Sequence, residues 1–100
     1  MEWNGRRIVV ADFPEPLDAR IHGAVTETDT KYLVFINPAC VGIVQRYALG
    51  HELAHIYLNH FYQLERDVMD CEREANRRAW EFYRAYRDGK LPVQPRPIGT

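Results

Sequence analysis

Residues 41–61 read VGIVQRYALGHELAHIYLNHF, and this stretch decides the fold that the sequence predicts. Apolar side chains occur almost all round a helix with this sequence, which is typical of the buried centre of a domain. Three ionisable groups, His51, Glu52 and His55, interrupt it close together. Residues four apart point about 40° apart around a helix, so the two imidazoles share one face. We expect a central helix that carries a compact polar cluster.

The segment His51-Glu52-Leu53-Ala54-His55 has the HExxH spacing. In this arrangement two histidines bind zinc, and the glutamate acts as a general base on water. The alternative is a pair of structural core histidines beside a helical glutamate. Burial of all three groups without a partner is costly, whereas a divalent cation satisfies them. The motif therefore predicts one zinc ion on His51 and His55, with Glu52 as the catalytic residue.

A catalytic zinc site needs a third protein ligand and keeps one position open. A second helix is expected over residues 65–87, and Glu72 lies on its apolar stripe rather than on its charged face. We expect Glu72 to bind the metal; a buried ion pair with Arg46 is the alternative. Asn76 lies one turn further on and is expected to accept a hydrogen bond from the second nitrogen of a ligating histidine. His60 lies on a different face and is not expected to bind the ion.

The N-terminal third predicts strands. The expected strands are 7–11, 21–26 and 32–36, with a turn over 28–30 between the last two. The strand 32–36 is apolar on both faces, which indicates cover on both sides. Asn37 is expected to cap the central helix and Gly89 to end the second helix. The predicted class is α+β: a small, mostly antiparallel sheet packed on the central helix and a second long helix.

Length and composition limit the possible functions. One hundred residues form one domain, expected over 1–90, followed by an extended tail at 91–100 that contains three prolines. Lys and Arg number 13 against 14 Asp and Glu, so no global field favours nucleic acid or an anionic membrane. No apolar run approaches the ~18–20 residues of a membrane span. Cys40 and Cys71 form no CxxC pair and are expected to be reduced thiols in a cytoplasmic protein; Cys71 points away from Glu72 and is not expected to be a ligand.

Four segments together resemble the gluzincin metallopeptidases, and most closely the ImmA/IrrE family. They are Ile36-Asn37-Pro38, Arg46-Tyr47-Ala48-Leu49-Gly50, the HExxH segment and Glu72-Arg73-Glu74-Ala75-Asn76. The compact layout is similar to the minigluzincins, which have a minimal zincin-like domain. This resemblance implies a zinc-dependent regulatory peptidase of phage or mobile-element type. It also implies a protein substrate such as a transcriptional repressor, and an edge strand, here 32–36, that pairs with the substrate backbone.

The expected chemistry is hydrolysis of a peptide bond. Zinc held by His51, His55 and Glu72 would carry water in its fourth position and lower the pKa of that water. Glu52 would take the proton as the water attacks and then deliver it to the leaving amine. The donor that stabilises the oxyanion is left open among Tyr83, Tyr86, His22 and His60.

Two other hypotheses remain open. In the first, the metal is bound but the protein is catalytically weak and serves as a protein-interaction module. In the second, the enzyme is latent because the segment 91–100 occupies its own cleft, for which its extended proline-rich shape is suited.

Overall fold

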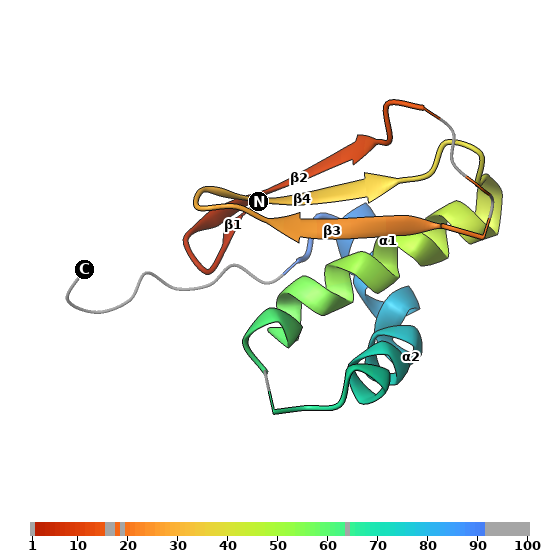
Figure 1. Cartoon of the computed structure of the whole chain (residues 1–100). Helices are drawn as coiled ribbons and strands as arrows, with labels where there is room; N and C mark the ends of the chain where they lie inside the picture. The colour runs from red at the N-terminus through yellow and green to blue at the C-terminus, as the bar shows by residue number, and fades with distance from the viewer. Residues whose placement is uncertain (1, 16–17, 19, 64, 92–100) are drawn as a thin grey trace.

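The computed structural model describes residues 2–15, 18, 20–63 and 65–91. In chain order the elements are β1 (Glu2–Trp3), β2 (Arg6–Asp12), β3 (Gly23–Glu27), β4 (Lys31–Ile36), α1 (Gly42–Tyr57), the short 3-10 helix η1 (His60–Tyr62) and α2 (Val68–Arg87). Figure 1 shows the sheet as one layer, with α1 running along one of its faces and α2 packed on the far side of α1. This arrangement confirms the predicted α+β class.

The four strands form one mixed sheet in the order β1-β2-β4-β3. β1 pairs with β2 and β3 pairs with β4 in antiparallel fashion, but β2 and β4 are parallel. The expectation of a mostly antiparallel sheet therefore holds for the two outer pairings and misses the central one. It was also wrong to expect an edge strand at 32–36, because β4 pairs with β3 along one edge and with β2 along the other. The edge strand near the helices is β3.

Only one face of β4 is fully covered by the described residues. Tyr32, Val34 and Ile36 are buried and face the helices. Leu33 and Phe35 alternate with them and are only partly buried, although the ring of Phe13 stacks on Phe35 at 5.4 Å between centroids. The expectation that this strand is covered on both sides was therefore wrong. β4 is one of the two inner strands of the sheet, with a neighbouring strand on each edge.

The central helix begins later than the sequence predicts. Its N-cap is Val41, while Asn37 is fully buried and forms a turn before the helix. The Asn37 amide donates to the carbonyl oxygens of Asp18 and Ile21, and its own Oδ1 accepts from the backbone N–H of Ala39. Asn37, which was expected to cap the helix, instead joins two loops by hydrogen bonds. It fixes the chain just before β3 against the chain just before α1.

Burial along α1 is uneven. Ile43 near its start is 68% exposed, whereas Leu53 and Ile56 in the second half are inaccessible to solvent. The expectation of a buried central helix therefore holds for the half that carries the HExxH segment. That half packs between the sheet and α2 and places its polar groups inside the protein.

Gly50 sets the distance between α1 and α2. A Cβ atom at this position would overlap the carbonyl oxygen of Ala79 and lie 3.1 Å from the Cβ of Tyr83. Only glycine lets the two backbones approach so closely. Because Gly50 directly precedes His51, this contact also fixes how far the motif lies from α2.

The end of α2 follows the predicted pattern. Gly89 has φ +67°, its N–H donates to the carbonyl of Tyr86, and the N–H of Lys90 donates to that of Ala85. This pair of bonds is a Schellman motif, which glycine favours at this position. Leu91 follows and belongs to the buried core cluster. The remainder of the predicted tail, 92–100, lies outside the described residues.

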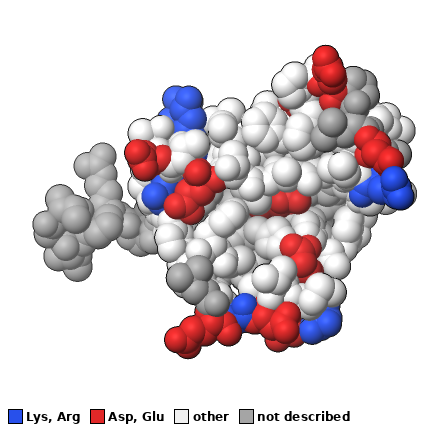
Figure 2. Space-filling view, in the orientation of Figure 1, with Lys and Arg blue, Asp and Glu red and all other residues white. Residues whose placement is uncertain are grey.

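Surface charge is dispersed over the face seen in Figure 2. Acidic and basic side chains lie mainly around its edges, and no large patch of one sign covers it. Among the helices of the described residues, none combines the length and apolar composition that crossing a membrane requires.

Candidate metal centre

The structure brings His51, His55 and Glu72 together. The two histidines project from the buried half of α1 and Glu72 from the second turn of α2. The Nε2 atom of His51 lies 3.0 Å from Glu72 Oε2, and that of His55 lies 3.1 Å from Glu72 Oε1. The two Nε2 atoms are 3.0 Å apart. Three side chains, each with one ligand atom to offer, therefore surround a common point.

These distances fit a tetrahedral zinc site. Zinc bonds of ~2.0–2.1 Å at tetrahedral angles place the ligand atoms roughly 3.3 Å apart. Burial, followed by the proximity of His51, lowers the pKa of His55 well below its usual range, which keeps that imidazole neutral. A neutral imidazole presents a lone pair, which a metal ligand requires. Among the described residues, these three are the cluster whose donor atoms could hold a metal ion.

Glu52 lies beside the cluster but is not part of it. Its side chain projects from α1 towards the sheet, where a Cβ atom on Gly23 of β3 would lie 3.5 Å from its Cγ. The residue is 8% exposed, and this burial raises the pKa of Glu52 to about 7, with a further contribution from the charge of Glu72. A carboxyl group with that pKa can accept a proton and release it again near neutral pH.

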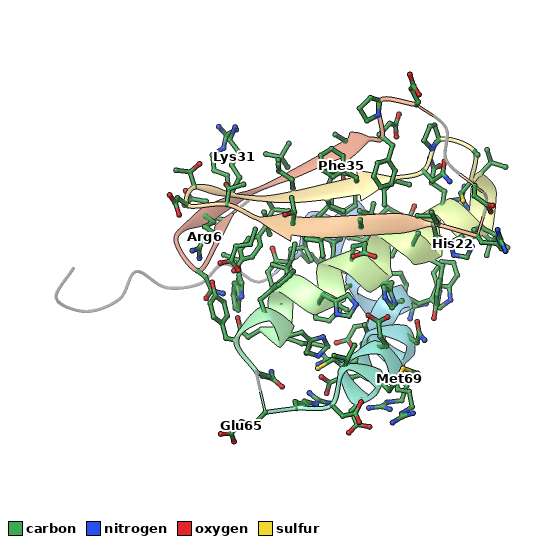
Figure 3. All side chains as sticks on the ribbon, viewed as in Figure 1. Arg6, His22, Lys31, Phe35, Glu65 and Met69 are labelled. Atoms are coloured by element: carbon green, nitrogen blue, oxygen red, sulfur yellow. The ribbon has the colours of Figure 1, made fainter. Side chains whose placement is uncertain are left out.

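A cavity of about 710 Å³ opens over these groups. Its lining comes from the start of β3, from α1, from the η1 segment and from the first turns of α2: His22, Gly23, Val25, Tyr47, Ala48, His51, Glu52, His55, His60, Phe61, Gln63, Arg66, Val68, Cys71, Glu72 and Asn76. Figure 3 shows His22 at the sheet side of α1 and Met69 on α2 at the opposite side. The edge strand β3 therefore borders the space above Glu52.

His60 has a place that the sequence did not predict. It lies at the start of η1, its side chain is 5% exposed, and its Nδ1 is 2.8 Å from Nδ1 of His55. Its Nε2 lies 2.7 Å from Glu74 Oε1, an oxygen that also accepts from Arg66 at 2.8 Å. The hydrogen bonds from His60 and Arg66 hold the pKa of Glu74 at about 2. The sequence could not show these contacts, because Arg66 and His60 precede α2 and reach Glu74 only once the chain has folded.

Asn76 does not have the predicted hydrogen bond. The residue is exposed at the cavity wall, and its backbone carbonyl accepts from the Tyr47 hydroxyl at 3.3 Å. The outer nitrogen of His55 faces His60, and that of His51 is buried without a partner among the described residues. His60 therefore occupies the position expected of Asn76, because η1 folds back beside α1.

The structure also bears on three other expectations: the partner of Glu72, the role of Cys71 and the donor to the oxyanion. Arg46 borders a separate, smaller depression with Trp80, so it is not the partner of Glu72. Cys71 lines the cavity but has no part in the cluster. Tyr83 and Tyr86 lie outside the cavity lining, whereas His22 lies within it. Of the open choices for an oxyanion donor, His22 and His60 line the cavity, and Tyr47 joins them as a choice that the sequence did not suggest.

No protein family, curated protein or solved structure matches the chain at a significant level.

Proposed function

We propose that this chain is a zinc-dependent metallopeptidase that hydrolyses a peptide bond in a protein substrate. The observation that carries the proposal is the convergence of two histidines and one glutamate beside a buried second glutamate. All four groups lie in one cavity that is large enough for a peptide segment. A purely structural metal site has no need of a carboxyl group that titrates near neutral pH beside it.

His51, His55 and Glu72 would hold the ion. When bound, zinc supplies a Lewis acid that polarises the peptide carbonyl and acidifies water at the open position. Glu52 accepts the proton of the attacking water and then gives it to the leaving amine. Its pKa of about 7, raised by burial, suits both steps. His22 or Tyr47, at the cavity wall, is placed to donate a hydrogen bond to the developing oxyanion.

The edge strand β3 supports a peptide as substrate. Within the part of the chain that the structure describes, β3 pairs with β4 on one side only, so its other edge offers backbone groups to an extended chain. Gly23 and Val25 of β3 line the cavity next to Glu52. A peptide added along this edge would cross the proposed zinc site. The expectation placed this role on the strand 32–36, and it is transferred to β3 because 32–36 is an inner strand.

The sequence resemblance to the ImmA/IrrE gluzincins extends the proposal to a regulatory role. It suggests a phage or mobile-element peptidase that acts on a transcriptional repressor in the cytoplasm. Cys40 and Cys71 are buried and form no disulfide among the described residues, which is compatible with that compartment. The alternative is a zinc-binding interaction module that recognises such a protein without cleaving it.

Cleavage by the purified chain with zinc tests the proposal. We expect a mixture of unstructured peptides to be cleaved by the wild type, and the products to vanish with a chelator. Glu52→Gln should reduce the rate at least 100-fold while the protein retains one zinc, because only the proton acceptor is removed. Glu81→Gln, on the exposed side of α2, is the matched control and should behave as wild type. Equal rates for Glu52→Gln and wild type would contradict the proposed role of Glu52, and zinc binding without any cleavage would favour the interaction module.

A further inference from the structure

The two histidines of the HExxH segment are held differently. His55 Nδ1 faces His60, and a continuous series of side chains leads from there through Glu74 to Arg66. His51 Nδ1 is buried and has no partner among the described residues. Among the described residues, the outer nitrogen of His55 therefore has a side-chain partner and that of His51 has none.

The direction of the hydrogen bonds in this series can be worked out from its outer end. The guanidinium of Arg66 can only donate, so Glu74 Oε1 is an acceptor. That oxygen also faces Nε2 of His60, so this nitrogen carries the proton of the ring. When the ring of His60 carries only this proton, its bare Nδ1 accepts the N–H at Nδ1 of His55. The consequence is a lone pair at Nε2 of His55, which is the atom that faces Glu72.

The position of His60 is itself fixed by the N-terminal hairpin. The preceding residue, Asn59, has φ +57°, in the left-handed region. Its side-chain oxygen accepts from Trp3 Nε1 at 3.2 Å and from Asn4 Nδ2 at 2.9 Å. These bonds hold the turn that aims the imidazole of His60 at His55. Hydrogen bonds therefore fix this series at Arg66 and at the turn before His60, and His60 itself is almost inaccessible to solvent. Such an arrangement is not a chance contact on the surface.

We propose that His60, Glu74 and Arg66 act as positioning residues that fix the ring orientation and tautomer of His55 for metal binding. The inference rests on the metal site proposed above and deepens it. Hydrogen bonds to the outer nitrogen of a ligating histidine raise its basicity and fix its orientation, and their loss typically weakens metal binding 10–100-fold. None of the three residues would contact the ion.

Zinc affinity of the full chain, measured by competition with a chromophoric chelator, tests this proposal. His60→Phe keeps an aromatic ring but cannot accept a hydrogen bond, and we expect the zinc Kd to rise 10–100-fold. His60→Asn retains an acceptor near the former Nδ1 and should keep the Kd within a few-fold of wild type. Glu74→Gln should weaken binding several-fold, whereas Glu81→Gln, which also loses a carboxylate paired with an arginine on α2, should not.

A second measurement separates positioning from folding. In chain labelled with 15N-histidine, NMR of the ring nitrogens should show the proton of His55 at Nδ1 in the wild type and in His60→Asn. This pattern should be lost in Glu74→Leu, which removes the acceptor of the His60 Nε2 proton, even where His60→Phe folds poorly. Wild-type zinc affinity in both His60→Phe and Glu74→Gln, or a His55 proton at Nε2 in the metal-free wild type, would overturn the proposal. A wild-type chain that binds no zinc would instead overturn the proposed function, and with it this inference.

Discussion

Glu52 is held where a carboxylate is least stable. It is buried between α1 and the start of β3, and the negative charge of Glu72 is close by. Stability is given up at such a position when a functional group must stay inside the protein. The sequence showed which residue this would be, because HExxH implies its role. It could not show why an ionised Glu52 destabilises the fold, since β3 and α2 approach this residue from distant parts of the chain.

Because of this burial, the free energy of unfolding of the metal-free protein should depend on pH. The pKa of Glu52 is raised from 4.5 to about 7 in the folded state, so its contribution to stability is present below pH 4.5 and is lost as the pH rises to 7. Glu52→Gln does not titrate. We expect the variant to be more stable than wild type by on the order of 1–3 kcal/mol at pH 8, with this difference vanishing near pH 4. Urea unfolding of both chains in a chelator, at several pH values, measures it; a difference that does not change with pH would contradict the burial of an ionised Glu52.

At the level of elements, the contact between α1 and α2 brings the acid to the histidines. The two ligands on α1 follow from a one-turn spacing that the sequence states directly. Glu72 could be proposed as a ligand because it interrupts an apolar stripe, and the structure places it within 3.1 Å of both imidazoles. The role of His60 could not be predicted, because it depends on η1 turning back beside α1 after a left-handed Asn59. Helical periodicity says nothing about a residue beyond the end of the helix.

The sheet shows the same division between local and non-local information. The hairpin of β3 and β4 could be predicted from its turn residues, which lie between two apolar runs. The parallel pairing of β2 with β4 could not, since it joins strands separated by a long connection. This single pairing turns the strand 32–36 from an edge into an inner strand. It therefore decides which strand borders the cavity.

Gly50→Ala tests the helix contact. The added methyl group would collide with the carbonyl of Ala79, so the two helices must move apart. We expect a loss of about 1–3 kcal/mol in the free energy of unfolding, together with weaker zinc binding as Glu72 moves away from the histidines. Gly89→Ala is the control: it strains a residue at φ +67° but meets nothing within 4 Å, so it should lower stability while zinc affinity stays unchanged. Tight zinc binding in Gly50→Ala would show that this contact does not set the site.

At the scale of the whole molecule, the end of the described chain is part of the core. Leu91 follows α2 and belongs to the buried cluster that the sheet and both helices form. A test of the latent-enzyme hypothesis must therefore keep it. Truncation after Gly89 would remove this side chain along with the proline-rich segment and would confuse instability with release of inhibition.

We expect Leu91→Ala to lower the free energy of unfolding by about 2 kcal/mol, as the loss of a buried leucine does. Thermal and urea unfolding of the variant beside the wild type measure this loss. Truncation after Leu91 removes only 92–100 and keeps this side chain. If Leu91→Ala is as stable as wild type, the result contradicts the burial of Leu91 in the core. A rise in peptidase activity on truncation after Leu91 would support the latent form of the enzyme.

The central claim is that side chains from two helices share one metal ion, and zinc content tests it most directly. Elemental analysis of the purified chain after dialysis should find one zinc per wild-type molecule. Glu72→Ala and His55→Ala should retain far less than one, while Glu52→Gln retains a full equivalent. Stoichiometric zinc in Glu72→Ala, or its loss in Glu52→Gln, would contradict the assignment of ligands and general base.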